Sequence, residues 1–143
     1  MILVDANLLL YAYDSSNARH QGARVWFEAL MNDEPDIRFG LATLLAFLRL
    51  STDPRVFDQP LGPAEAVDVV ESWLARPNVS IAHTSERHWS GLAELSEAAK
   101  ARGPLMMDAH LAALTMEHGA RLATTDRDFT RFPGLRFEDP LAG

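Results

Sequence analysis

Residues 1–14 read MILVDANLLLYAYD, and the change of residue type within them sets the expectation for the whole chain. Ile2, Leu3 and Val4 form a short apolar run with two β-branched residues, which is typical of a buried strand in a parallel sheet. The run ends at Asp5, and a second apolar stretch follows within two residues. A carboxylate buried there without a partner would be costly, so Asp5 needs a hydrogen-bond partner, water or a function.

The composition of the chain is that of one globular domain. Its 143 residues are 48% hydrophobic and include no cysteine, so disulfides and thiolate metal sites are excluded. No apolar run approaches the ~18 residues of a membrane span, and no repeat, low-complexity segment or signal-peptide pattern is present. We therefore expect a single domain over residues 1–143, in the cytoplasm and without membrane contact.

The charge of the chain is acidic. The net charge is −7 and the sequence pI is near 5.1, and Lys100 is the only lysine among the 13 basic residues. This charge argues against a broad nucleic-acid groove, because phosphates are neutralised by cations. It is compatible with a cation-binding site or with a basic protein partner. Phosphates would be bound locally by arginines, whose planar guanidinium groups match phosphate geometry.

Apolar residues spaced i, i+3, i+4 and i+7 predict the helices. Asp53-Pro54 ends one of them, and Pro63 has the place of a first-turn proline in the next. Thr84 or Ser85 is the expected cap of a later helix that runs to about Arg102. The apolar faces are Ala23, Trp26, Phe27 and Leu30; Leu41, Leu44, Leu45 and Leu48; Ala66, Val69, Val70 and Trp73; and Ala109, Ala112, Ala113 and Met116.

Further strands are expected at 78–82 (NVSIA), at 121–124 (RLAT) and at 135–137. Strands separated by helices predict an α/β sandwich with a mostly parallel sheet flanked by helices. In such sheets, ligands bind at the carboxyl ends of the strands. Asp5 follows one strand and Asp126 follows another, so their carboxylates meet at one edge if both strands are central.

Four aspartates at element junctions are candidates for a functional site, and each could instead cap a helix or turn. Asp108 opens the helix expected at MDAHLAALTMEHG, and Asp126 and Asp128 flank Arg127 in TTDRDF. Clustered carboxylates raise one another's pKa unless a cation is present. A hard divalent ion such as Mg²⁺ takes oxygen ligands and supports phosphodiester hydrolysis. Together with Asp5, these residues predict a metal site.

Other catalytic patterns are weak. The histidines His20, His83, His88, His110 and His118 form no H-x-x-x-H or H-E-x-x-H pattern, so we expect them at the surface or behind the ligating residues. No phosphate-binding loop and no G-x-S-x-G elbow exist. The tryptophans and phenylalanines lie at helical spacing and are expected in the core.

The segments VDANLLLYAYD, LLAFLRLSTDPRVF, MDAHLAALTMEHGARLATTDRDF and RFPGL together resemble the PIN-domain toxins of the VapC type. The resemblance spans nearly the whole chain, in order and at family spacing. It implies a PIN-like three-layer sandwich and a Mg²⁺- or Mn²⁺-dependent endoribonuclease of a toxin–antitoxin pair. It also implies a homodimer that acts on RNA and is neutralised by a small antitoxin, through which alone it would reach operator DNA.

The resemblance also assigns residues. Asp5 and Asp108 would be metal ligands, and Asp126 would complete the catalytic acidic pocket, with Asp128 as a further ligand. The residues implied as helpers are Asn7, Arg49 and Thr125. An antitoxin tail would find apolar anchor points around 44–48 and Trp73.

One position departs from the family pattern. The glutamate usual on the helix before F-L-R is replaced by Ala46, and residues 37–52 contain no acid. This favours an alternative in which a PIN fold without turnover holds RNA or an antitoxin, although the retained aspartates speak against it. A third reading is a phosphotransfer domain with Asp5 as nucleophile, but it lacks a D-x-D-x-T motif and a partner lysine.

Overall fold

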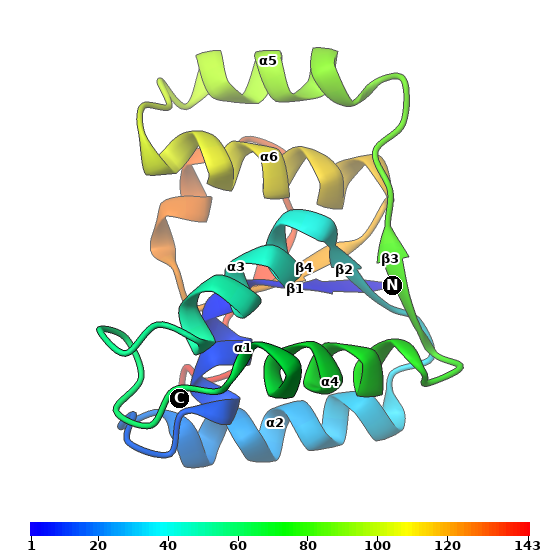
Figure 1. Cartoon of the computed structure of the whole chain (residues 1–143). Coiled ribbons are helices and arrows are strands. Elements are labelled where there is room, and N and C mark those ends of the chain that lie inside the picture. Colours follow the sequence, from blue (N-terminus) through cyan, green and yellow to red (C-terminus); the bar gives the residue numbers. More distant parts are fainter.

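The computed structural model describes residues 1–143 and has a five-stranded sheet between two layers of helices (Figure 1). The strand order is β3-β2-β1-β4-β5, and every neighbouring pair is parallel. The expected α/β sandwich with a parallel sheet is therefore confirmed. The strands are β1 (Ile2–Val4), β2 (Ile37–Gly40), β3 (Val79–Ala82), β4 (Arg121–Ala123) and β5 (Phe137–Glu138).

The helices cover both faces of the sheet (Figure 1). Residues of α1 to α4 pack into one core, and residues of α5, α6 and the 3-10 helix η1 pack into the other. No helix is long and apolar enough to cross a membrane. The helices are α1 (Ala6–Tyr13), α2 (His20–Asp33), α3 (Leu41–Ser51), α4 (Pro63–Leu74), α5 (His88–Ala98), α6 (Pro104–Glu117) and η1 (Arg127–Arg131).

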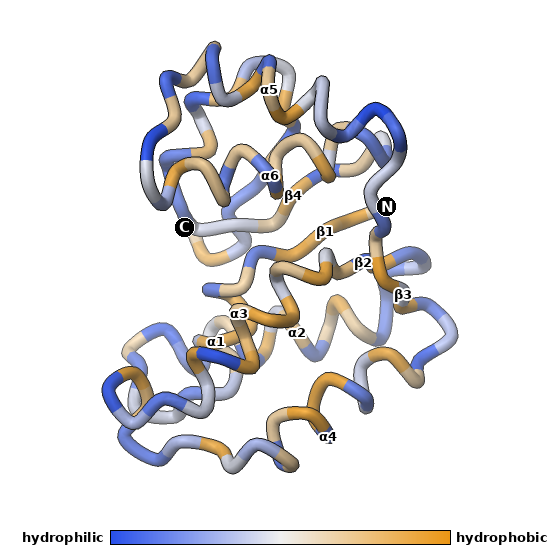
Figure 2. The backbone as a smooth tube through the Cα atoms, turned by 45° about the horizontal axis from the view of Figure 1, so that its top comes forward, coloured by the Kyte–Doolittle hydropathy of each residue, from blue (hydrophilic) through white to orange (hydrophobic).

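The central strand β1 is buried on both faces. Ile2 and Val4 belong to the core shared with α1 to α4, whereas Leu3 belongs to the core beneath α6. This alternation follows from the two-residue period of a strand, and burial of both faces explains why all three residues are apolar. Figure 2 shows β1 as a hydrophobic stretch in the middle of the fold.

The strand order reverses at β1. The chain passes from β1 to β2 on one side and returns after β3 to place β4 on the other side. Such a switch point leaves a crevice at the carboxyl ends of the two strands, where ligands bind in open α/β sheets. Asp5 directly follows β1, and Asp126 comes shortly after β4. The fold therefore brings both predicted carboxylates to the switch point.

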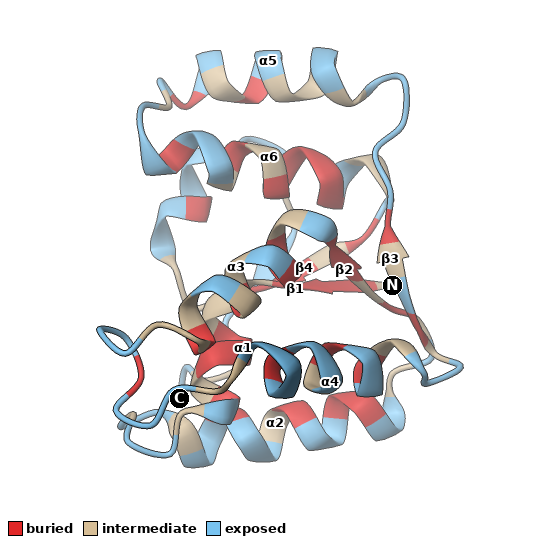
Figure 3. Cartoon of the chain, in the orientation of Figure 1, coloured by how far each residue is buried: buried red, intermediate tan, exposed pale blue.

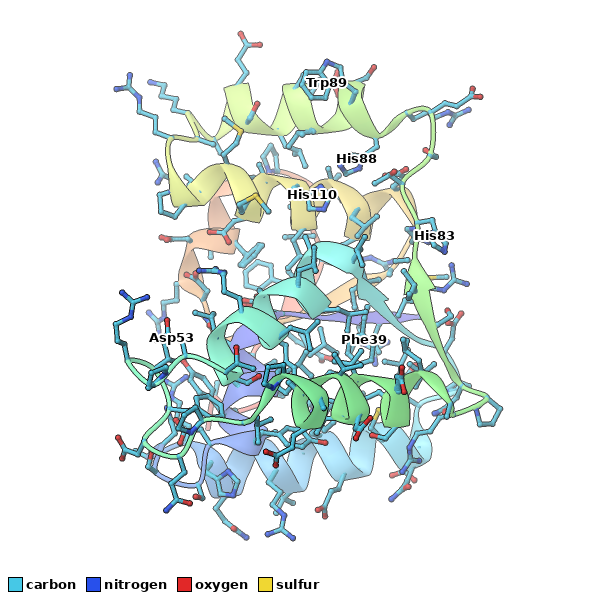
Figure 4. All side chains as sticks on the ribbon, in the orientation of Figure 1. Phe39, Asp53, His83, His88, Trp89 and His110 are labelled. Carbon is cyan, nitrogen blue, oxygen red and sulfur yellow. The ribbon has the colours of Figure 1, made fainter.

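Aromatic side chains fill the core between the sheet and helices α1 to α4. The indole of Trp73 lies 4.9 Å from the ring of Phe47 and 5.4 Å from that of Phe39, measured between centroids. Its Nε1–H donates to the hydroxyl of Tyr13 at 3.0 Å. Figure 3 shows buried segments on the inward side of α4, and Figure 4 places Phe39 between this helix and the sheet.

Several sequence predictions need correction. The strand β2 was not anticipated, because Arg38 interrupts its short apolar pattern. Helix α5 has Arg87 and not Thr84 or Ser85 at its N-cap, since the residues before it form a turn in which the Ser85 hydroxyl accepts from the Arg87 N–H, and the helix ends at Ala98 and not near Arg102. Trp89 is 77% exposed on α5, so the expectation that every tryptophan lies in the core is wrong.

The buried Trp73 and the exposed Trp89 give a matched test of the core. We expect Trp73→Ala to lower the free energy of unfolding by about 3–5 kcal/mol, because it removes a large buried ring and leaves a cavity. Trp89→Ala should change it by less than about 0.5 kcal/mol, since the ring is exposed. Urea unfolding followed by circular dichroism measures both. Equal losses in the two variants would contradict the assignment of the core.

Candidate metal centre

The carboxylate of Asp5 is held at the end of β1 by the neighbouring strand. Its backbone N–H donates to the carbonyl of Ala123 at 2.9 Å, which extends the β1–β4 ladder by one residue. Its Oδ2 accepts from the hydroxyl of Thr124 at 2.8 Å. Asp5 occupies the N-cap position of α1, but no side-chain capping hydrogen bond forms there. Capping alone therefore does not explain this residue.

Thr124 connects Asp5 to the next acidic residues. Its buried hydroxyl donates to Asp5 and accepts the backbone N–H of Asp126 at 3.0 Å. The Oδ1 of Asp126 in turn accepts the backbone N–H of Asp128 at 2.9 Å and caps η1. The capping role considered for Asp126 is thus present, and it leaves the other carboxylate oxygen available.

Asp108 reaches the same place from the opposite helix layer. The sequence placed it at the start of a helix, but α6 already begins at Pro104 with Gly103 as its N-cap. Proline fits the first turn because its missing N–H would have no partner there. Asp108 therefore projects from the body of α6, and an N-cap role for it is wrong.

Three of the four predicted carboxylates converge closely enough to share an ion. One oxygen from each of Asp108, Asp126 and Asp128 lies within 4.8 Å of the others. Asp5 stands beside this group, close enough for its charge to act on Asp108 and Asp126. An all-carboxylate donor set fits a hard divalent cation such as Mg²⁺ or Mn²⁺. The residues present thus fit the ion that the sequence predicted.

The ionisation of the cluster reflects its crowding. Burial raises the pKa of Asp108 to about 6, and the charges of Asp126, Asp5 and Asp128 add to the effect. Burial also raises the pKa of Asp5, although the Thr124 hydroxyl and the N–H groups of Ala6 and Asn7 oppose the shift. Raised carboxylate pKa values are typical of a site where a bound cation offsets the negative charge.

A pocket of about 510 Å³ adjoins the carboxylates. Asp5 and Asp108 line it, and so do Ala46 and Arg49 from α3. The position of the absent family glutamate therefore faces the acidic residues. Gly40 allows the end of β2 to lie close to α6, because a Cβ there would lie only 2.8 Å from the Leu114 side chain of α6.

The other predicted helpers are placed differently. No side-chain hydrogen bond joins Asn7 or Thr125 to the four carboxylates. The threonine that contacts Asp5 is Thr124, one residue before the one we expected. The sequence offered two threonines, Thr124 and Thr125, directly before Asp126. Which of the two side chains contacts Asp5 depends on the register of β4, which the sequence does not give.

The sequence also missed an arrangement of histidines beside the pocket. His88 Nδ1 lies 2.8 Å from Glu117 Oε2, and His88 Nε2 lies 2.8 Å from His110 Nδ1. His110 lines the acidic pocket, and burial followed by the neighbouring His88 charge lowers its pKa. Figure 4 shows His88 on the side of α5 that faces α6, where His110 lies, while Trp89 points away. Residues 22 apart in sequence gave no spacing pattern to recognise.

Comparison with known proteins identifies the family and the fold of the chain. The PIN domain family matches residues 2–135. Ribonuclease VapC37 of Mycobacterium tuberculosis is 37% identical over 142 residues, with 99% of each chain covered. The crystal structure of M. tuberculosis VapC20, a sarcin-ricin loop cleaving toxin, superposes with a TM-score of 0.70 at 19% identity over 95% of this chain and 99% of that one.

A toxin–antitoxin complex from Klebsiella pneumoniae gives a TM-score of 0.65 at 20% identity over 98% of both chains. At that identity the solved structures establish the fold alone. The family match and the full-length relative establish the family. The chain belongs to the PIN domain family, among the VapC proteins. The resemblance read from its motifs is confirmed.

The raised pKa of Asp108 predicts how stability depends on pH. Its value of about 6 in the folded chain exceeds the 3.8 of an unperturbed aspartate, so the folded state binds this proton more tightly. The stabilisation is complete below pH 3.8 and is lost as pH rises through about 6. Asp108→Asn should therefore match the wild type below that window and melt at a higher temperature above it, by roughly 2–4 °C for each kcal/mol relieved.

Scanning calorimetry in EDTA at several pH values measures this difference. Solvent screens part of the effect at a half-buried site, so the sign and the pH window are the test, more than the size. The exposed Asp68→Asn serves as control and should track the wild type throughout. A difference in melting temperature that is the same at all pH values would contradict the assigned ionisation.

Proposed function

We propose that the chain is a metal-dependent endoribonuclease that acts as the toxin of a toxin–antitoxin pair. The observation that carries the proposal is the convergence of three carboxylates, with Asp5 beside them, at the switch point between β1 and β4. The name of the full-length relative, Ribonuclease VapC37, supports RNA as the substrate. The whole chain acts as a single PIN domain in this proposal, in the cytoplasm.

Each residue of the site has a proposed role in catalysis, metal binding or phosphate binding. Asp5, Asp108 and Asp126 are the catalytic carboxylates, and together with Asp128 they would hold Mg²⁺ or Mn²⁺. When bound, such an ion neutralises phosphate charge and lowers the pKa of a water. Thr124 keeps Asp5 oriented through its 2.8 Å hydrogen bond. Arg49, at the pocket wall, offers the local cation that an RNA phosphate needs on a chain of net charge −7.

The proposed antitoxin surface keeps part of the predicted anchor region, residues 44–48, but not Trp73. Trp73 is only 3% exposed and Leu44 is buried, so neither can anchor a partner. Leu41 and Leu45 are 59% and 56% exposed beside the acidic pocket and offer the apolar contacts instead. A basic antitoxin side chain would complement the carboxylates. DNA is reached only through the antitoxin, and a homodimer completes the proposed assembly.

A second candidate function is retained because of Ala46. A PIN fold with one acid fewer could hold RNA or an antitoxin without turnover. The specific observation in its favour is that Ala46 lines the pocket beside Asp5 and Asp108, where an acid would contribute to a metal site. The two functions differ in one measurable property, which is metal-dependent cleavage.

Substitution of the carboxylates tests the enzyme. We expect Asp5→Asn and Asp108→Asn each to reduce RNA cleavage in Mg²⁺ or Mn²⁺ by about 100-fold or more, as removal of one charge-stabilising group does. The assay follows cleavage of total RNA and of labelled oligonucleotides, with EDTA as the metal-free condition. Asp68→Asn is the matched control and should retain full activity, since this residue is exposed on α4.

Two results would separate the candidates. Cleavage by the wild type that EDTA abolishes supports the enzyme. Tight RNA binding with no cleavage in either metal would favour the binding module. Unchanged cleavage by a folded Asp5→Asn variant would remove this residue from the site.

The missing acid predicts weak occupancy by a second ion. Fewer carboxylates attract cations less strongly, so we expect one well-bound ion and a second only at high metal concentration or with RNA present. Ala46→Glu should tighten Mn²⁺ binding about fivefold or more, because a charge pair at 4 Å contributes ~1 kcal/mol even in water. It should also raise the cleavage rate.

Titration calorimetry on the wild type and on both Ala46→Glu and Ala46→Gln decides the point. The glutamine variant matches the glutamate in size and lacks its charge, so it should bind metal as the wild type does. Tight binding of two ions by the wild type without RNA would show that another residue supplies the acid.

A further inference from the structure

The acidic pocket has one wall without acids. Helix α3 follows β2 directly (Figure 1), and Gly40, Thr43 and Arg49 line the same 510 Å³ cavity as Asp5 and Asp108. No residue of α3 is acidic, and its single charged side chain is that of Arg49. The cavity therefore joins a carboxylate wall, which suits a cation, to a wall that suits an anion.

The start of α3 lies one strand away from Asp5. Strands β1 and β2 are parallel, with Leu3 opposite Arg38. Two residues further along each strand, the same register brings Asp5 beside Gly40, which is the N-cap of α3. Neighbouring strands are about 4.8 Å apart. A small group bound near Asp5 can therefore also contact the first turn of α3.

The first turn of α3 presents backbone donors at this point. The N–H groups of Leu41, Ala42 and Thr43 have no i−4 acceptor within the helix. No side chain caps them, because the N-cap residue is Gly40. Such N–H groups and the helix dipole favour an anion. Since every helix begins with N–H groups of this kind, the specific feature must come from a side chain.

That side chain is Thr43, whose buried hydroxyl has no partner in the protein. Thr43 is 6% exposed. The buried hydroxyls of Thr115 and Thr124 both form hydrogen bonds, and Ser51 Oγ is the only fully enclosed side-chain atom without one. The Thr43 hydroxyl is therefore reached from the cavity that the residue lines. Its Oγ1 lies 3.8 Å from the place that a Cβ of Gly40 would occupy, which is at the open end of the helix.

The chemistry of these groups selects the ligand. A backbone N–H can only donate, and a threonine hydroxyl can donate as well. Together they fit an oxygen that carries charge and no proton. In an RNA strand, the non-bridging phosphate oxygens are the atoms of this kind. Hydrogen bonds from neutral donors to such an ionised acceptor are stronger than those to a neutral one.

We infer that the first turn of α3 binds a non-bridging oxygen of the cleaved RNA phosphate, with the Thr43 hydroxyl and the N–H groups of Ala42 and Thr43 as donors. The inference rests on the proposed ribonuclease function and assigns the phosphate a place between α3 and the carboxylates. Donors fixed in this way stabilise negative charge that develops on the phosphate oxygen during cleavage.

Binding is tested with dimethyl phosphate, a phosphodiester that has neither base nor ribose. In ¹⁵N–¹H NMR spectra of the wild type with Mg²⁺, we expect millimolar dimethyl phosphate to move the amide resonances of Ala42 and Thr43 downfield. The first turn of α4 is the control. It also follows a glycine N-cap, but the Glu65 carboxylate lies there and accepts from the Gly62 N–H at 3.1 Å, so the Ala64 and Glu65 resonances should stay in place.

Thr43→Val isolates the hydroxyl, because valine keeps the shape of the side chain and lacks the oxygen. The variant should melt at the temperature of the wild type or slightly above it, since no hydrogen bond within the protein is lost. It should lose about five- to tenfold both in affinity for dimethyl phosphate and in kcat/KM for RNA, the value of one hydrogen bond. Thr43→Ser should restore both. Thr84→Val is the matched control and should behave as the wild type, since Thr84 is exposed and lies outside the acidic cavity.

Two results overturn the phosphate site while the ribonuclease function stands. The first is a wild type that cleaves RNA but whose Ala42 and Thr43 resonances do not respond to dimethyl phosphate. The second is a folded Thr43→Val variant that binds dimethyl phosphate and cleaves RNA as the wild type does. A wild type that cleaves no RNA in either metal removes the proposed function, and the amide shifts then decide alone for or against a phosphate site on α3.

Discussion

Parallel pairing of β1 with β4 is the constraint on which the site depends. The ladder joins Val4 to Ala123, and the next residues along each strand are Asp5 and Thr124. The backbone contact between Asp5 and Ala123 carries this register one residue beyond the strand end. Because the sheet order reverses at β1, no crossover helix fills the crevice there, and the carboxylates can face a common space.

The buried hydroxyl of Thr124, at the end of β4, fixes the positions of the acidic residues relative to the sheet. One hydroxyl donates to Asp5 and accepts from the Asp126 backbone, so two loops that carry acids are held at a fixed separation. Asp108 then enters from α6, whose place is set by packing of its alanines on the sheet. Burial of a carboxylate and repulsion among these charges are the energetic cost of the arrangement, and both raise the pKa of Asp108.

The same helix also carries a polar contact to α5, two positions after Asp108. His110 lies two residues beyond Asp108, and its ring is oriented by α5 through His88. The outer helix pair is thus tied to the pocket by polar contacts as well as by the apolar core around Leu95 and Ala109. Helix α5 is therefore held against α6 by its inner face, while its outer face, which carries Trp89, is exposed.

The sequence by itself determined the α/β class, most helices and the two strand-end aspartates, because burial of both faces of β1 and the helical spacing of apolar residues leave local signals. Tertiary structure alone decided the strand β2, whose Arg38 hides its pattern, and the position of Asp108 within α6. It also decided that Thr124 and not Thr125 holds Asp5, and that His88 meets His110. Those contacts join residues distant in sequence, and only the register of strands and the packing of helices bring them together.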